Sequence, residues 1–231
     1  MAIYAIGDLH LPGNHDKPMN VFGIQWDNHF ETIQNNWREC VREDDVVLIP
    51  GDISWAMRLE DAVSDLESIA ELPGEKILIR GNHDYWWSSI GKVREVLPSR
   101  MHALQNDAIA IGDTVFCGTR GWTFPTEFSP LEAQELKIFN REVARLEMSL
   151  NDAVKKAGDK PVIALMHFPP LLVDGLETAF SQTLENAGVA DVVYGHLHGI
   201  GIKNGFSGTR RGVRYHLVSC DSIEFAPVRI K

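Results

Sequence analysis

The sequence is poor in cysteine, and its few cysteines are scattered. Cys40, Cys117 and Cys220 are the three in 231 residues, and their spacing matches neither a disulfide framework nor a metal or redox motif. The first residues have the pattern of a buried strand rather than of a cleavable signal. An odd number of cysteines without a signal favours reduced thiols, so we expect a cytoplasmic protein.

Long apolar runs and an excess of basic residues are also missing. No stretch approaches the roughly 18 apolar residues of a membrane span, so no membrane association is expected. Lys and Arg number 22 against 32 Asp and Glu, which gives a net charge of -10. Non-specific nucleic-acid binding needs a basic surface and is therefore not expected. A small anionic substrate stays compatible, because bound metal ions would add positive charge locally.

Against this background, five apolar stretches each end in Asp, Asn or His. Each stretch has the composition of a buried β-strand; they are residues 2–6, 46–50, 76–80, 162–166 and 191–194. The polar residues that follow them are Asp8, His10, Asp52, Asn82, His167, His196 and His198. Because ligands bind at the carboxyl ends of strands in α/β sheets, we expect these seven side chains to meet.

Seven nitrogen and oxygen donors are too many for one four-coordinate ion. They suit two divalent ions that share a carboxylate and keep open positions for water. Manganese and iron fit such donors best, with zinc as an alternative. Taken singly, each residue has an ordinary explanation, since a lone His is usually a core or surface residue and Asp after Gly is common in turns. The fivefold recurrence favours the metal site.

The same motifs resemble the calcineurin-like metallophosphoesterase superfamily in order and in extent. The matching blocks are Gly7-Asp8-Leu9-His10, Gly51-Asp52, Gly81-Asn82-His83-Asp84, His167 and Gly195-His196-Leu197-His198. The resemblance implies an α/β fold, a four-layer αββα sandwich of two mixed β-sheets flanked by helices. One difference concerns the residues after the second block, where many members carry a further acidic residue and this sequence has Ile53-Ser54-Trp55-Ala56. That difference leaves the subfamily and the substrate open.

The resemblance also implies a role for each ligand residue. It assigns Asp8, His10 and His198 to one ion. It assigns Asn82, His167 and His196 to the other ion, with Asp52 bridging the two.

Two further residues of the third block are expected to act without binding metal. The resemblance implies that His83 is catalytic, and we expect it to protonate the leaving oxygen or stabilise the charge there. Asp84 would orient His83 by a hydrogen bond. The implied activity is hydrolysis of phosphate esters.

Four side chains are candidates for contact with the substrate: Trp55, Trp86, Trp122 and Arg120. Trp55 closely follows Asp52, and three successive aromatics that include Trp86 cannot all face one core. Arg120 lies between two glycines and could clamp a phosphate. A place in the core for the tryptophans and a structural ion pair for Arg120 remain the alternatives. His15 and Asp16, in the long loop 11–25, are further candidates.

Three functions fit these features. A small-molecule phosphomonoesterase or phosphodiesterase is favoured, with a small phosphorylated substrate as its partner. A nuclease or a protein Ser/Thr phosphatase of the same superfamily is the alternative, although the acidic net charge disfavours the first and the short chain the second. A non-catalytic protein-binding scaffold is least compatible, because every ligand position is filled. The sequence does not indicate an oligomeric state.

The chain is expected to form one domain, 1–231, because the motifs are spread through all of it. Apolar spacing predicts a helix capped by Asp27, with His29 exposed on it, and a longest helix at 131–156. A hairpin is predicted at 108–117, and a last strand at 223–230.

Overall fold

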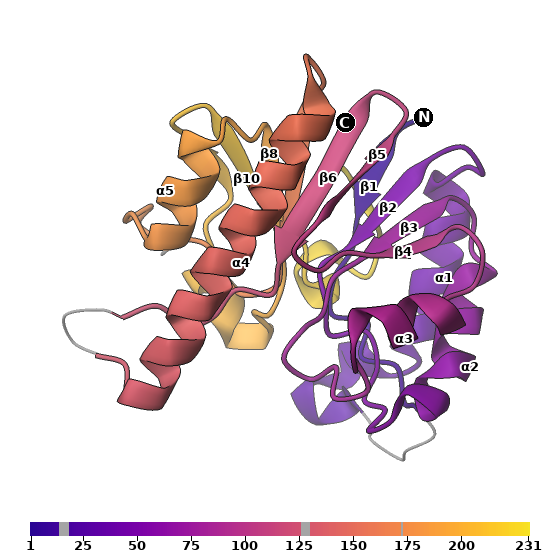
Figure 1. Cartoon of the computed structure of the whole chain (residues 1–231). Coiled ribbons are helices and arrows are strands. Elements are labelled where there is room, and N and C mark those ends of the chain that lie inside the picture. Colours follow the sequence, from indigo (N-terminus) through magenta and orange to yellow (C-terminus); the bar gives the residue numbers. More distant parts are fainter. Residues whose placement is uncertain (14–18, 126–129, 172) are drawn as a thin grey trace.

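The computed structural model describes residues 1–13, 19–125, 130–171 and 173–231. It contains two β-sheets that pack against each other, with helices on their outer faces (Figure 1). This is the mixed four-layer arrangement that the sequence predicted. His15 and Asp16 lie outside the described residues.

The first sheet has the strand order β11-β1-β2-β3-β4. Four neighbouring strands of this sheet run parallel: β1 (Ile3–Ala5), β2 (Val46–Ile49), β3 (Glu75–Leu78) and β4 (Met101–Ala103). The short strand β11 (Val228–Arg229) runs antiparallel to β1.

The second sheet has the order β5-β6-β7-β8-β10-β9. Its parallel centre consists of β6 (Thr114–Thr119), β7 (Val162–Met166), β8 (Asp191–Tyr194) and β10 (Val213–Leu217). The edge strands β5 (Ala108–Ile111) and β9 (Gly208–Arg210) are antiparallel to their neighbours, and β5 with β6 forms the predicted hairpin.

Alternating side chains fill the layers on either side of each sheet. Val46 and Leu48 of β2 pack between the two sheets, whereas Val47 and Ile49 pack beneath the helices. Strands covered on both faces read as continuous apolar runs, which is why the sequence revealed them.

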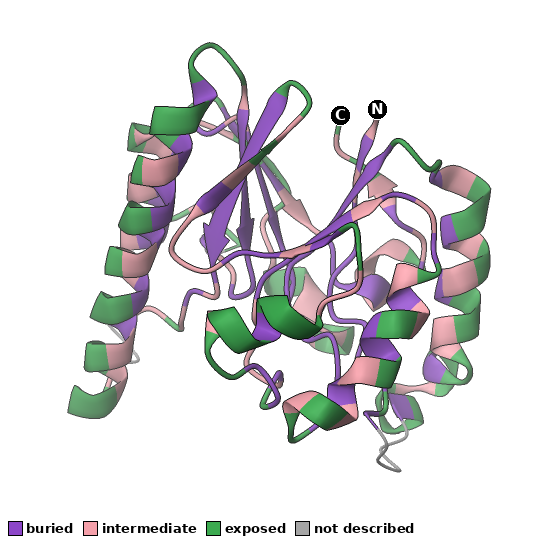
Figure 2. Ribbon diagram, turned by 45° about the vertical axis from the view of Figure 1, so that its right-hand side comes forward, coloured by how far each residue is buried: buried purple, intermediate pink, exposed green. Residues whose placement is uncertain are grey.

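Helices cover the outer face of each sheet. The first sheet packs against α1 (His29–Cys40), α2 (Leu59–Ala70) and α3 (Ile90–Val96), and the second against α4 (Ala133–Ala157) and α5 (Ala179–Asn186). Figure 2 shows exposed residues along the outer sides of the helices and buried residues along the strands. Among the described residues, no helix combines the length and the apolar composition needed to cross a membrane.

Some local predictions were wrong. The last strand does not reach back to residue 223, because Cys220–Ile223 forms a 3-10 turn and Glu224 has a positive φ of 53° that interrupts extended backbone. The residue that precedes α1 is Asn28 rather than Asp27. His29 is half-buried rather than exposed.

Candidate metal centre

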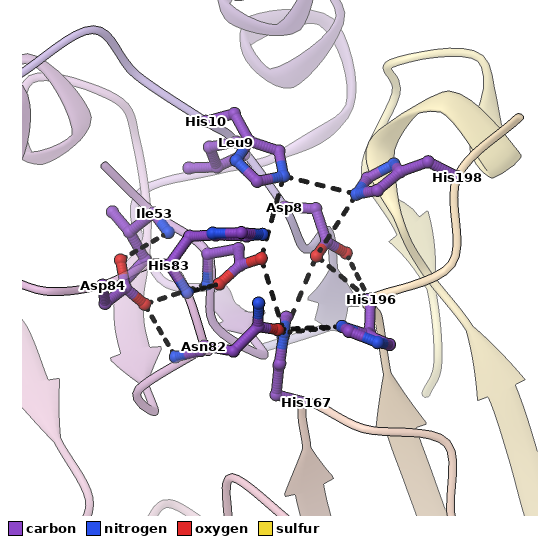
Figure 3. A network of polar contacts seen from close by, with 12 residues as sticks. Asp8, Leu9, His10, Ile53, Asn82, His83, Asp84, His167, His196 and His198 are labelled. Atoms are coloured by element: carbon purple, nitrogen blue, oxygen red, sulfur yellow. Dashed lines mark hydrogen bonds and ion pairs between the residues drawn. The ribbon is translucent and has the colours of Figure 1, made fainter. Parts of the chain in front are cut away.

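The seven predicted ligand residues meet where the parallel strands end, and Figure 3 labels all of them except Asp52. The first sheet supplies the side chains that follow β1, β2 and β3, and the second sheet those that follow β7 and β8. The two sheets therefore deliver their motifs to one place, as expected for the carboxyl ends of packed α/β sheets.

The donor atoms fall into two groups. Oxygen and nitrogen atoms of Asp8, His10 and His198 lie within 4.8 Å of one another, and so do those of Asp52, His167 and His196. The amide oxygen of Asn82 belongs with the second group. It lies 2.6 Å from Nε2 of His167 and 2.9 Å from Nδ1 of His196.

The carboxylate of Asp52 belongs to the second group and also faces the first. Its Oδ2 is 3.4 Å from Nε2 of His167 in one group and 3.8 Å from Nε2 of His10 in the other. Its Oδ1 accepts a 2.8 Å hydrogen bond from the backbone N–H of His83, which fixes the carboxylate. Asp52 is therefore positioned so that one oxygen faces both groups.

Two imidazoles are each oriented by a partner at the ring nitrogen Nδ1. Nδ1 of His198 lies 2.8 Å from Oδ1 of Asp221, and Nδ1 of His167 lies 3.0 Å from the carbonyl oxygen of Pro50. A partner on one ring nitrogen directs the other nitrogen, here Nε2, toward a metal. Sequence reasoning missed Asp221, although its place after the apolar strand β10 follows the same rule as the other motifs.

His29 is a second residue that the sequence did not identify. Its Nε2 lies 2.9 Å from the carbonyl oxygen of Leu9, and its Nδ1 lies 3.2 Å from that of Trp26. Leu9 separates Asp8 and His10, two of the predicted ligand residues. His29 thus ties the start of α1 to the loop that carries both of them.

Four of the predicted ligand residues have strained backbone. Asp8, His10, Asp52 and His196 have φ values of 60°, 47°, 51° and 75°, in the left-handed region that side chains disfavour. Such conformations cost about 1–3 kcal/mol each and concentrate at functional sites. The remaining structure must offset that cost to hold these side chains in place.

Two motif glycines are required by close packing. A Cβ atom on Gly81 would lie 2.1 Å from Oδ1 of Asp52, and one on Gly195 would lie 2.1 Å from Oδ2 of Asp8. Any side chain at either position would displace one of these two carboxylates. The glycines therefore allow the strand exits to approach the carboxylates.

The ionisation of the imidazoles suits metal binding in one respect and opposes it in another. Burial lowers the pKa of His10 well below its usual value and that of His196 to about 3, so both rings offer a lone pair. Burial also disfavours the charged form of His198, but hydrogen bonds to Asp221 and Asp8 raise its pKa to about 10. An ion bound through His198 would therefore have to displace a proton from its ring.

Several carboxylates crowd into this buried site. Burial raises the pKa of Asp52 to about 7, and the charges of Asp84 and Asp8 add to that effect against the influence of His167. Burial opposes ionisation of Asp8 as well, but His198 and His167 hold its pKa below the usual range. Divalent cations would offset the repulsion between these carboxylates, so the donor set fits metal ions.

His83 and Asp84 occupy different positions around the ligands. The ring of His83 lies 4.5 Å from that of Trp55, and both line a small pocket together with His10, Asp52 and His198.

The Asp84 carboxylate is fully buried and accepts hydrogen bonds from five donors. They are the backbone N–H groups of Asp52, Ile53, Ser54 and Gly81 and the indole N–H of Trp86, at 2.7–3.2 Å. These contacts hold the loop that carries Asp52. The sequence had suggested only an orienting contact with His83.

The four substrate candidates occupy different places, and not all of them adjoin the predicted ligand residues. Trp55 stacks on His10 with ring centroids 4.9 Å apart, and Trp122 lines an apolar pocket that includes His196. Trp86 is buried in the core between the first sheet and its helices. The guanidinium of Arg120 lies 4.7 Å above the Trp122 ring and 3.5 Å from Glu142, in a separate pocket.

Known proteins resemble this chain in sequence and in fold. Over 79 residues it is 37% identical to the Gene 66 protein of Mycobacterium phage L5, a match that covers 33% of this chain and 37% of the phage protein. The match thus spans little more than a third of the phage protein.

Two solved structures share the fold. One is a protein of unknown function from Aquifex aeolicus, with a TM-score of 0.51, 15% identity and coverage of 99% of this chain and 95% of that chain. The other is the phosphopantetheinyl hydrolase of Mycobacterium tuberculosis, with a TM-score of 0.56, 16% identity and coverage of 94% and 88%.

Residues 1–199 match the sequence model of the calcineurin-like phosphoesterases, and these residues include every side chain of the two donor groups. The chain therefore belongs to the calcineurin-like phosphoesterase family, whose members are metal-dependent hydrolases of phosphate esters.

Proposed function

We propose that this protein hydrolyses a small phosphate monoester or diester by direct attack of water on phosphorus, with two divalent ions bound. The observation that carries the proposal is the position of Asp52, whose Oδ2 faces both donor groups. A shared carboxylate between two sets of nitrogen and oxygen donors is the arrangement that a two-ion site needs.

In this proposal, Asp8, His10 and His198 hold one ion, and Asn82, His167 and His196 hold the other. Asp52 contributes to both. The donors are imidazoles, carboxylates and one amide, which suits manganese or iron, with zinc as the alternative. When bound, such ions polarise phosphoryl oxygens and lower the pKa of a water molecule in the site.

The protein itself supplies proton transfer and orientation. His83 lines the pocket that the ligand residues form, so it is placed to protonate the leaving oxygen. Trp55 packs against both His83 and His10 and limits the movement of their rings. Asp84 keeps the Asp52 loop in place through its backbone hydrogen bonds.

The surroundings support a small substrate with an apolar part. An apolar pocket of about 210 Å³ adjoins His196 and is lined by Trp122, Phe168, Pro169 and Leu197. A pocket of this size suits one aromatic or short aliphatic group of a phosphate ester. The net charge of -10 argues against a polyanionic nucleic acid.

The test is hydrolysis of p-nitrophenyl phosphate and bis(p-nitrophenyl) phosphate by protein loaded with manganese. Metal content is measured on the same sample. We expect turnover with more than one ion per chain, loss of turnover after chelation, and recovery when manganese is restored. Full activity in protein from which all metal has been removed would refute the proposal.

A further inference from the structure

A second pocket, lined by arginines, has walls from α4 and from the segments at the ends of β3 and β6. Its volume is about 260 Å³, and its charged lining residues are Arg80, Arg120, Arg141, Glu142 and Arg145. Among the described residues, it shares no lining residue with the small pocket at the metal ligands.

Positive charge is in excess in this pocket. Glu142 is its one carboxylate among the described residues, and it is fully buried. Its Oε1 lies 2.8 Å from Arg145, 3.5 Å from Arg120 and 3.8 Å from Arg141. One carboxylate thus faces three guanidinium groups, with Arg80 as a fourth cation in the same pocket.

Two of these guanidinium groups have donors that the described part of the chain does not satisfy. The Nε atoms of Arg80 and Arg120 are buried without a hydrogen-bond partner there. Arg80 also forms no ion pair with a described carboxylate, although its side chain is only partly exposed. A buried donor without an acceptor is costly, so an acceptor from outside the described chain would be stabilising.

The pocket is connected to the metal centre through the backbone. Arg80 precedes the ligand Asn82 by two residues, and the carbonyl oxygen of Arg120 accepts hydrogen bonds from the N–H groups of His167 and Phe168 at 3.1 and 2.9 Å. A molecule bound between these arginines would therefore contact the same segments that carry two metal ligands.

We propose that the arginine pocket binds a phosphate-type oxyanion, with Arg80 and Arg120 as its central donors and Arg141 and Arg145 at its edge. Guanidinium groups match the oxygen spacing of phosphate through paired N–H donors, which a lysine cluster would not do. The oxyanion is either free inorganic phosphate or a second phosphate group of the substrate. The site itself does not depend on turnover at the metal centre.

Arg80→Gln is the most direct test. Arg80 forms no ion pair with a described carboxylate, so its removal leaves no described carboxylate without its partner. Equilibrium dialysis of manganese-loaded protein with radiolabelled inorganic phosphate should detect pocket binding in addition to binding at the metal centre. Arg80→Gln should weaken the pocket binding about tenfold or more. Arg38→Gln, which removes an exposed arginine on α1, is the matched control and should leave binding unchanged.

A metal-centre variant separates the two binding events. Asp52→Asn should remove the phosphate bound at the ions and retain the phosphate in the pocket. Arg141→Gln, at a side chain that is 55% exposed, repeats the pocket test if Arg80→Gln lowers the melting temperature or the metal content. Phosphate binding that Asp52→Asn abolishes, and that both arginine variants leave intact, would overturn the proposal.

Substrate kinetics then distinguish the two sources of the oxyanion. If the pocket holds a second phosphate of the substrate, Arg80→Gln should raise KM for a bisphosphorylated ester and leave KM for p-nitrophenyl phosphate unchanged. If the pocket takes free phosphate, Arg80→Gln should leave both KM values the same while it weakens phosphate binding. An inactive wild-type protein would refute the proposed hydrolysis. The dialysis result would still show whether the arginine pocket binds phosphate.

Discussion

Replacing Asp221 with Asn is expected to weaken the binding of one ion and leave the other nearly unchanged. Asp221 contacts His198, which belongs to the donor group of Asp8 and His10, and makes no described contact with the second group. The change is nearly isosteric, so it removes a charge without opening a cavity.

The size of the effect follows from the 2.8 Å contact between Nδ1 of His198 and a carboxylate that is 3% exposed. A hydrogen bond to a charged partner contributes about 1.5–3 kcal/mol net, which corresponds to roughly 10- to 100-fold in affinity. Loss of an outer partner of a metal-binding histidine typically lowers metal affinity by a similar factor. Because Asp221 also raises the pKa of His198, its removal eases the release of the proton. At pH 7 we therefore expect a loss near tenfold.

The assay is competition between the protein and a fluorescent chelator for manganese, analysed as two binding steps. Asp113→Asn makes the same chemical change at an exposed turn between β5 and β6 and should bind both ions like the wild type. If Asp221→Asn bound two ions with wild-type affinity at both steps, the inferred role of Asp221 would be wrong. Equal weakening of both steps would mean that the donor groups do not bind ions separately.

Three further predictions concern the ligands and the proton donor. Asp52→Asn should lower the affinity for both ions by more than about 100-fold, because losing a shared ligand costs more than losing an outer partner of a ligand. His10→Ala should lower the affinity for mainly one ion. Wild-type metal titrations for Asp52→Asn would contradict this prediction. The His83→Ala variant should still contain both ions by elemental analysis, and its turnover should fall by about 10²–10⁴-fold. The fall should be smaller for esters with good leaving groups. Loss of an ion would mean that His83 is a ligand instead. Because the pKa of His198 is raised to about 10, its ring is protonated at neutral pH, so manganese affinity should rise by at least about tenfold per unit from pH 6 to 8. A titration series that showed no change with pH would contradict that assignment.

The sequence predicted the motif-bearing strands because each has a local signature. An apolar run covered on both faces, followed at once by a polar residue, is visible without knowledge of the neighbours. The convergence of Asp8 and Asn82 then follows from parallel strands of one sheet, whose carboxyl ends share one edge, and His196 joins them because the second sheet packs with its carboxyl ends at the same place. The two ligand groups were assigned by resemblance, and the distances in the structure are consistent with them.

Features that depend on distant contacts were not predictable. Asp221 contacts His198, and His29 contacts the carbonyl oxygen of Leu9, 20 residues earlier in the chain. The three-residue strands β4 and β9 lack the longer apolar run that surrounds β1, so they show no period. The arginine pocket unites residues from 80 to 145 that share no motif. Such partners are set by tertiary packing rather than by local sequence.

Each donor group takes side chains from both sheets, and this has a consequence for folding. His10 and His198, 3.3 Å apart at Nε2, are separated by 188 residues along the chain. An ion held by both would act as a reversible cross-link that closes almost the whole polypeptide into a loop. Such a link restricts the unfolded chain and forms only after the two halves have docked. Ion uptake should therefore be a late event in refolding, and chelation should first loosen the contact between the halves, as amide hydrogen exchange along β1 and β8 would report.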